Sequence, residues 1–330
     1  MTTAKSVVVA TVLAVLFGAG AQAQPYQLTL AGASPGGLWS TIGVGIDKAL
    51  AKAYPGTTVT YQTGSGGLAN AKLVSDGKVP MGIAADMELA AAYRGTGPFK
   101  GQPLKNLRTL FRTYSAQGRF QYDYVLVNGD VAKKYDIKTM ADLKKHAGDL
   151  RIAFNRPGNM DGDVGIAIVE ESGIPLDSFK QVVRAASKEM GSLMLDRRID
   201  AIVLGIAYNH PTIREMANGI PLTMLSVDKK VAAKVADDFG GQVCTIKAGE
   251  HTFISEDKDS VCVGTVVLAN ASMPEKEAYD LVKGFLANLD DYKSAHRLLN
   301  KETTPKTVAE PSVVPWHPGA AKALKEAGLQ

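Results

Sequence analysis

The sequence predicts an α/β fold with two lobes, and two observations carry that prediction. Strand-like apolar runs alternate with helical patterns, and glycine-containing loops at residues 32–37, 64–67 and 155–162 lie where a strand-like run meets a helical one. Strand, loop, helix and strand in succession form βαβ units with parallel strands. These units occur in two sets, and a chain of 330 residues is long enough for each set to bury its own core.

The first set begins with an alternating strand at residues 26–31. Its loop opens a helix in which apolar residues recur at i, i+3 and i+4 between Trp39 and Ala53. This spacing is typical of a helix with one buried face. We therefore expect a strand, a glycine loop and an amphipathic helix in that order.

The next stretch repeats the pattern and is predicted to bind a ligand. A strand at residues 59–63 meets the loop Gly64-Ser65-Gly66-Gly67, a short helix covers 68–75, and a strand at 81–85 ends at Asp86. Backbone N–H groups and the helix dipole converge where such a loop opens a helix, and together they favour an anion. The crevice at the carboxyl ends of parallel strands is the usual ligand site of open α/β sheets.

The second set starts after a strand-rich stretch at residues 107–128. The loop at 155–162 again opens a helix, but sequence identity between the two sets is not evident, so only the architecture repeats. Strands are predicted at 124–127, 150–154, 182–183, 199–204 and 222–227, and helices at 140–145, 163–172, 188–197 and 212–217.

The tail resembles neither set and is predicted to return to the first lobe. A strand at 261–269 precedes Ser272-Met273-Pro274-Glu275, which has capping-box spacing with a proline in the first turn. We expect helices over 278–289 and 290–299, and a last helix closed by Gly328. Two crossing strands, near 120–128 and 261–269, then join lobe I (24–121 and 260–330) to lobe II (122–259).

The N-terminus predicts export. Lys5 precedes an apolar run at residues 7–19, and Ala21-Gln22-Ala23 fits a small-residue cleavage site. The run is shorter than the roughly 20 residues that span a bilayer. Residues 1–23 are therefore predicted to be a signal peptide cleaved after Ala23, and the mature protein is expected in the periplasm.

Composition and motifs exclude several functions. The net charge is +4, from 37 basic and 33 acidic residues, and no basic run exceeds a pair, so we expect no nucleic-acid partner. Neither glycine loop has the ending of a Walker P-loop or a full GxGxxG. No GxSxG elbow appears and the five histidines lack zinc-ligand spacing. The sequence therefore predicts no cofactor and no enzyme.

The start of the second set also has the spacing of a calcium-binding loop. Asn159, Asp161, Asp163 and Glu170 hold positions 1, 3, 5 and 12 of that pattern. Val164 stands where the calcium loop needs glycine for its turn. Residues that begin a helix explain the same letters, so no metal is expected.

Several short pieces together resemble the TAXI family, the extracytoplasmic solute-binding proteins of TRAP transporters. They cover nearly the whole mature chain in order: residues 36–43, 63–67, 95–99, 246–249 and 316–320. The resemblance implies a two-lobed periplasmic-binding-protein fold of the class II type that delivers its ligand to a membrane permease. Family members are associated with glutamate, related amino acids and small carboxylates such as 2-oxoglutarate. Trp39 stands where the family usually has tyrosine, and Ala84-Ala85-Asp86 replaces its Gln-Ser-Asp.

The predicted ligand site combines both lobes, and several of its members have a second interpretation. Asp86 either caps the following helix or contacts the ligand, Trp39 either packs in the core or walls the cleft, and Arg156 forms either a surface salt bridge or a contact with a carboxylate. Asp86 or Asp161 is expected to take an ammonium if the ligand is an amino acid. The candidate residues are Ser34, Gly37, Trp39, Ser65, Gly66, Asp86, Arg156, Asn159, Asp161 and Tyr208.

The sequence thus predicts a binding protein whose partners are a small organic anion or amino acid and the TRAP permease subunits. The alternative is a secreted ligand-binding partner of a membrane sensor, which would signal and not transport. Cys244 and Cys262, both in β-prone runs, are expected to pair because an exported cysteine pair often oxidises. A bridge of this span would contribute roughly 3 kcal/mol.

Overall fold

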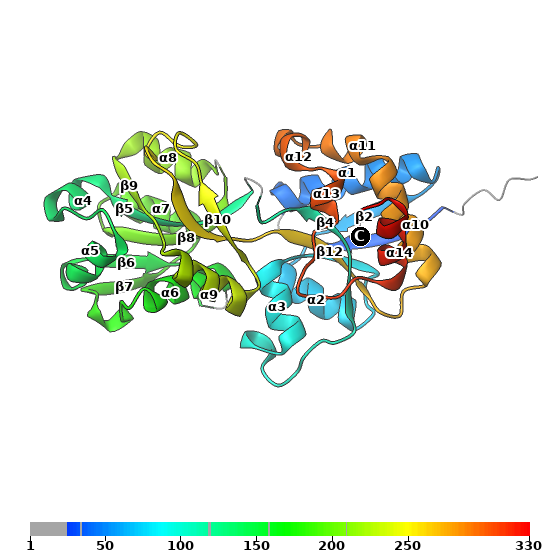
Figure 1. Cartoon of the computed structure of the whole chain (residues 1–330), viewed down its shortest axis with the longest axis horizontal. Helices are drawn as coiled ribbons and strands as arrows, with labels where there is room; N and C mark the ends of the chain where they lie inside the picture. Colours follow the sequence, from blue (N-terminus) through cyan, green and yellow to red (C-terminus); the bar gives the residue numbers. More distant parts are fainter. Residues whose placement is uncertain (1–24, 34, 118–119, 158, 209) are drawn as a thin grey trace, which may run out of the picture.

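Two α/β lobes lie side by side along the long axis of the molecule (Figure 1). The computed structural model describes residues 25–330 except 34, 118–119, 158 and 209. The predicted signal peptide and Ser34 therefore lie outside the described residues. Among the residues described, no helix has the length and apolar character needed to cross a membrane.

Lobe I is built on a mixed sheet of order β2-β1-β3-β12-β4. Strand β1 pairs in parallel with β2 and with β3, as the βαβ pattern predicts, and β12 returns from the tail to pair antiparallel with β3 and β4. The strands are β1 (Gln27–Ala31), β2 (Thr58–Gln62), β3 (Met81–Ala85), β4 (Leu107–Tyr114) and β12 (Thr265–Asn270).

The helices of lobe I cover this sheet with residues from both ends of the chain. The predicted apolar stripe of α1 is confirmed, because Ile42, Ile46 and Leu50 are fully buried. Burial of such side chains stabilises the lobe by about 1.5–3 kcal/mol each. The helices are α1 (Leu38–Ala53), α2 (Gly67–Ser75), α3 (Asp86–Arg94), α10 (Glu275–Ala287), α11 (Leu289–Lys293), α12 (Arg297–Glu302), α13 (Pro305–Val308) and α14 (Pro318–Glu326).

Lobe II has a sheet of order β10-β11-β5-β8-β6-β7, with β9 also paired to β5. Its strands are β5 (Gln121–Asn128), β6 (Arg151–Phe154), β7 (Gln181–Arg184), β8 (Ala201–Ala207), β9 (Leu222–Leu225), β10 (Gln242–Ile246) and β11 (Lys258–Cys262). Its helices are α4 (Gly129–Tyr135), α5 (Met140–Lys145), α6 (Met160–Glu171), α7 (Ser187–Leu195), α8 (Pro211–Gly219) and α9 (Lys229–Phe239).

The crossings between the lobes are shorter than the sequence predicts. The chain passes from β4 to β5 over residues 115–120, and from β11 to β12 over residues 263–264. The predicted single strand at 261–269 is broken at Gly264, where a Cβ atom would lie 2.6 Å from the Tyr114 carbonyl oxygen. Only glycine allows the two crossings to approach so closely.

Two local predictions in the tail were wrong. Ser272 does not cap α10: its N–H and hydroxyl both donate to Asn270 Oδ1, and the cap position is Pro274, which makes no side-chain cap. The helix expected over 290–299 is interrupted after Lys293 and resumes at Arg297. In both places side-chain hydrogen bonds competed with the helical pattern.

Cys244 and Cys262 form a disulfide between the antiparallel strands β10 and β11, with Cα atoms 5.9 Å apart. Both residues are buried, so neither sulfur is open to solvent. We expect the exported protein, denatured without reductant, to show no free thiol and a mass 2 Da below the reduced form. Detection of two free thiols would contradict this pairing.

Candidate ligand-binding site

A cavity of about 470 Å³ lies between the lobes. Lobe I contributes the loop after β1, the first turn of α1 and the start of α12, and lobe II contributes the end of β8 and the start of α8. Its lining comprises Gly36, Gly37, Leu38, Thr41, His296, Arg297 and Leu298 from lobe I, and Ala207, Tyr208, His210, Pro211 and Arg214 from lobe II.

The first turn of α1 presents backbone N–H groups to this cavity that have no side-chain cap among the described residues. Gly37 is the N-cap residue, and no side chain caps the helix. The amides of Leu38 to Ser40 precede the first backbone hydrogen bond of the helix, which Thr41 donates to the Gly37 carbonyl at 3.3 Å. Because the free amides and the helix dipole both favour negative charge, this wall suits an anion.

Trp39 lies in the same turn and is half-buried. Its ring packs against the core of lobe I and against the apolar cluster that joins α3 to lobe II. The structure thus shows that Trp39 packs in the core at the junction of the lobes, while its role as a wall of the ligand cleft stays a prediction. Any movement of the lobes would change its surroundings.

The facing wall in lobe II carries Tyr208, His210 and Arg214. The Tyr208 hydroxyl donates to the Glu250 carbonyl at 3.2 Å, and His210 Nδ1 accepts from the Thr212 amide at 3.2 Å. Burial lowers the pKa of His210, which favours its neutral form at pH 7.

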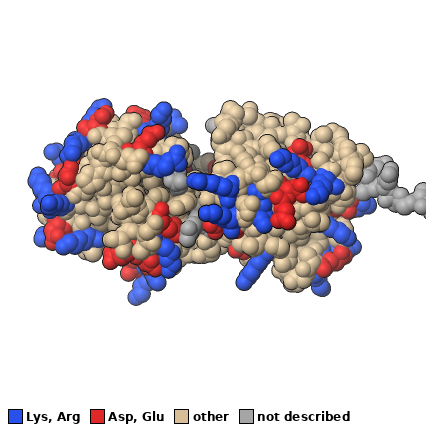
Figure 2. Space-filling view, turned by 90° about the horizontal axis from the view of Figure 1, so that it is seen from above, with Lys and Arg blue, Asp and Glu red and all other residues tan. Residues whose placement is uncertain are grey.

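The positive charge of the cavity therefore comes from Arg214 of lobe II and Arg297 of lobe I, both exposed. Helices α8 and α12, which carry them, stand on either side of the junction in Figure 1. Seen from above, Lys and Arg side chains gather close to the groove between the lobes (Figure 2). The cavity thus combines an open helix N-terminus with two guanidinium groups.

The second glycine loop holds an anion, but that anion is part of the protein. Glu88 accepts hydrogen bonds from the Gly67 amide at 3.2 Å and the Ala85 amide at 2.9 Å. Gly67 has to be glycine, because a Cβ there would lie 1.8 Å from Glu88 Oε2. Burial raises the pKa of Glu88 to about 7, against the effect of these amide hydrogen bonds. Ser65 is exposed and Gly66 is the N-cap of α2, with a φ of 101°.

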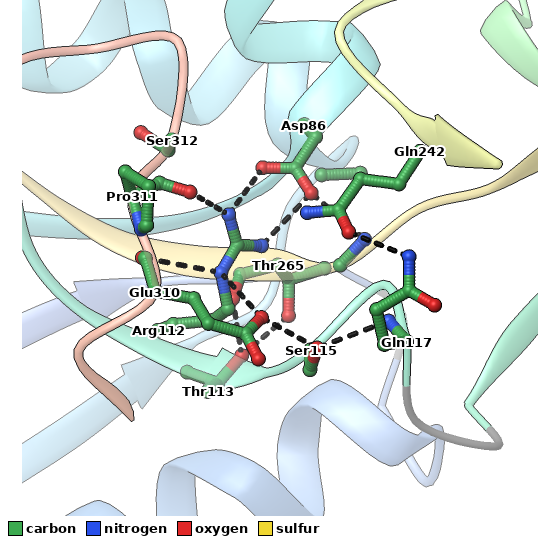
Figure 3. Close-up of polar contacts among 12 residues, drawn as sticks. Asp86, Arg112, Thr113, Ser115, Gln117, Gln242, Thr265, Glu310, Pro311 and Ser312 are labelled. Atoms are coloured by element: carbon green, nitrogen blue, oxygen red, sulfur yellow. Dashed lines mark hydrogen bonds and ion pairs between the residues drawn. The ribbon is translucent and has the colours of Figure 1, made fainter. Parts of the chain in front are cut away.

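Asp86 does not cap α3, because the cap position is Ala85. Its carboxylate is 2% exposed and binds Arg112, with Nη1–Oδ2 at 2.8 Å and Nη2–Oδ1 at 3.1 Å. The Gly264 amide donates to the same carboxylate at 2.8 Å. Figure 3 shows this pair at the centre of a network that holds the crossings and the C-terminal segment together. Both oxygens of Asp86 thus have protein partners at the hinge.

The network continues from lobe I into lobe II. Gln117 Nε2, in the first crossing, donates to Gln242 Oε1 at 2.8 Å and to the Val243 carbonyl at 2.9 Å. A second polar contact joins the lobes where Arg94 of α3 donates to the Asp237 carbonyl, at the end of α9, at 2.7 Å. The lobes are therefore joined by polar contacts as well as by the chain.

The predicted loop at 155–162 has a different arrangement from the one expected. Asn159 is the N-cap of α6 and accepts from the Asp161 amide at 2.9 Å, so the helix begins at Met160 and not at Asp163. Arg156 has an exposed side chain and does not line the cavity described above. The calcium-loop spacing falls on a helix, and among the described residues no three His, Cys, Asp or Glu side chains are grouped as metal ligands.

Asp161 lies in the first turn of α6 and is half-buried. It accepts from Gln121 Nε2 at 3.0 Å. Burial and the nearby carboxylate of Glu88, which lies in the other lobe, raise its pKa to about 7. The ammonium site predicted at Asp161 therefore has an acidic neighbour that the sequence did not suggest.

Of the predicted residues, the structure brings Gly37 and Tyr208 into the interlobe cavity and places Trp39 beside it. Sequence reasoning missed Arg214, Arg297, Glu88, Asp123 and Gln121. Arg214 could have been found from its place in the first helix after β8, since that strand ends at the ligand edge. Arg297 comes from the tail, and no local pattern links it to this edge.

The two-sheet, two-lobed architecture is that of class II periplasmic solute-binding proteins. A TctC solute-binding protein from Polaromonas is 13% identical over 84% of this chain and 88% of its own, with a TM-score of 0.57. PhnD1 from Prochlorococcus marinus, solved with methylphosphonate, is 13% identical over 93% of this chain and 100% of its own, with a TM-score of 0.56. The model of the NMT1-like family matches residues 30–328, and the chain belongs to that family.

Proposed function

We propose that this chain is the extracytoplasmic solute-binding component of a TRAP-type transporter of the TAXI type. It captures a small carboxylate or amino acid, glutamate-like or 2-oxoglutarate-like, in the interlobe cavity. The observation that carries the proposal is the composition of that cavity: uncapped amides of α1 from lobe I face Arg214 from lobe II. Neither lobe alone offers both groups.

The mechanism follows from the placement of the α1 amides in lobe I and of Arg214 in lobe II. A solute carboxylate accepts from the α1 amides and from a guanidinium, which forks onto a carboxylate with two parallel hydrogen bonds. Arg297 shares lobe I with the amides, whereas Arg214 belongs to lobe II, so its contact adds to theirs only when the lobes are close. The solute therefore shifts the population toward the closed form. The closed form is the one that the permease subunits recognise. The apolar run at 7–19 directs the chain to the periplasm.

The test is to identify the solute that the purified protein carries. Mature protein is denatured, and the small molecules released are weighed by mass spectrometry. We expect a carboxylate or amino acid of a size that fits about 470 Å³, in near-equal amount to the protein. Release of a solute that has no carboxylate, with no binding of carboxylates or amino acids added afterwards, would contradict the proposal.

Tryptophan fluorescence reports the predicted closure. The chain has two tryptophans: Trp39 lies at the junction of the lobes, and Trp316 packs against the core of lobe I, where it bridges to Thr109. Closure changes the solvation of Trp39 and thus its emission. We expect Trp316→Phe to keep the solute-induced change and Trp39→Phe to lose it. A signal that disappears with Trp316 would place closure elsewhere.

A further inference from the structure

Two carboxylates of lobe II, Asp123 and Asp161, meet one step beyond the interlobe cavity. Gln121 pairs with Ala207 and Asp123 with Gly205 across β5 and β8, so these residues share one face of the sheet. Ala207 lines the cavity, and Asp123 therefore lies about 7 Å deeper on the same face. Asp161 reaches this spot from α6 through its hydrogen bond with Gln121.

Asp123 and Asp161 both extend into the space that a side chain at position 205 would fill, and Gly205 leaves this space open. A Cβ atom at Gly205 would lie 2.6 Å from Asp123 Oδ1 and 2.9 Å from Asp161 Oδ1. Both oxygens thus converge on the same small space above β8. Glu88, from lobe I, is near enough to contribute to the raised pKa of Asp161, after the larger effect of burial.

The convergence leaves a polar atom without a partner. Asp123 is 2% exposed, and its Oδ1 has no hydrogen bond in the described part of the chain. No lysine, arginine or histidine of the described residues forms an ion pair with Asp123, Asp161 or Glu88. Burial and the charge of Asp161 raise the pKa of Asp123 well above its ordinary value. A buried oxygen of this kind is costly unless a further group binds it.

A primary ammonium group supplies what the cluster lacks. It carries one positive charge and three N–H donors, and the cluster offers the oxygens of two carboxylates at one point. We propose that Asp161 and Asp123 form a subsite for a primary ammonium group of the solute. This inference rests on the proposed function, since the carboxylate of the same solute binds in the adjoining cavity. The solute is then an amino acid and not the corresponding keto acid.

Pairs of solutes that differ in the ammonium group measure its contribution to the binding affinity. L-Glutamate and 2-oxoglutarate, and L-alanine and pyruvate, differ at the carbon that carries nitrogen or the keto oxygen. Binding of all four is measured by titration calorimetry at pH 8, where Asp161 and Glu88 are mostly ionised and the amines are protonated. We expect the amine of at least one pair to bind at least tenfold more tightly than its keto partner.

Two variants test the residues. Asp161→Asn is expected to weaken amine binding at least tenfold and to leave keto-acid binding within twofold, and Asp123→Asn is expected to give the same pattern. The matched control is Asp163→Asn, on the same turn of α6 but 3.7 Å from Arg184, which should change neither. The melting temperature without solute distinguishes a binding role of Asp161 from a structural one. A carboxyl group whose pKa is raised on folding destabilises the folded protein above that pKa. We therefore expect Asp161→Asn to raise Tm at pH 8.

Each other outcome has a definite meaning. A keto acid that binds as tightly as its amine overturns the ammonium subsite and leaves the carboxylate-binding function standing. An equal loss for both members of a pair, or a lower Tm in Asp161→Asn, assigns the cluster a structural role and overturns the inference. If none of the four solutes binds, the proposed ligand class fails and the inference fails with it.

Discussion

Replacing Arg112 with alanine is expected to lower the free energy of unfolding by about 3–5 kcal/mol, the largest effect that we predict for a single substitution. Arg112 is 1% exposed, and its partner Asp86 is 2% exposed. Removal of the guanidinium leaves an ionised carboxylate buried beside the Gly264 amide. The loss of one partner from a buried pair costs more than the pair itself contributes.

The guanidinium also fastens the C-terminal segment. Its Nη2 donates to the Pro311 carbonyl at 2.7 Å, beside Glu310 and Ser312 in Figure 3. The alanine variant therefore frees that segment from the hinge. We expect this loosening to appear as faster amide hydrogen exchange in the strand pair β4 and β12.

Chemical denaturation measures the effect, and two further variants control it. Arg108→Ala, on the same strand, removes a half-buried guanidinium that donates to the nearby Lys105 and Leu107 carbonyls, and should cost about 1 kcal/mol. The double variant Asp86→Leu with Arg112→Met should be less destabilised than Arg112→Ala, because no charge remains buried. A loss for Arg112→Ala no greater than that for Arg108→Ala would show that the pair carries little of the stability of the hinge.

Local patterns predicted most of the fold because they depend on neighbours in sequence. The strand at residues 81–85 and the helix that ends at Ala53 agree with β3 and α1, since alternation and the 3.6-residue period act within one element. The break at Gly264 was missed because it arises from contact with Tyr114, 150 residues away in the chain.

The site could be predicted only in part, for a related reason. A glycine loop before a helix signals an anion, but the sequence does not say which anion, and at Gly67 the anion is Glu88. The place of Asp123 inside a strongly apolar strand could have marked it as a candidate site residue, because a buried carboxylate in such a strand usually has a functional or structural partner. The meeting of Asp123 with Asp161 depends on how α6 packs beside Gly205 of β8, which no local pattern contains.

Replacing Arg214 with alanine is expected to weaken binding of the proposed carboxylate solute by about 1.5–3 kcal/mol, roughly 10- to 150-fold. Arg214 lines the cavity opposite the uncapped turn of α1, so its loss removes the cation that lobe II supplies. Arg214→Lys keeps the charge but not the two-pronged geometry, and should recover part of the loss. Calorimetry with the solute identified by mass spectrometry gives the affinities.

Comparison of Arg156→Ala with Arg214→Ala in solute binding tests which arginine contacts the solute carboxylate. The sequence left two roles open for Arg156, a surface salt bridge or a contact with the ligand carboxylate, and its substitution tests the second of them. Because its exposed side chain is not part of the cavity lining, we expect Arg156→Ala to bind within twofold of the wild type. A large loss in Arg156→Ala together with normal binding in Arg214→Ala would move the carboxylate from the start of α8 to the loop before α6. In that case the amides of α1 would no longer share the solute with Arg214, and closure would depend on a different pair of contacts.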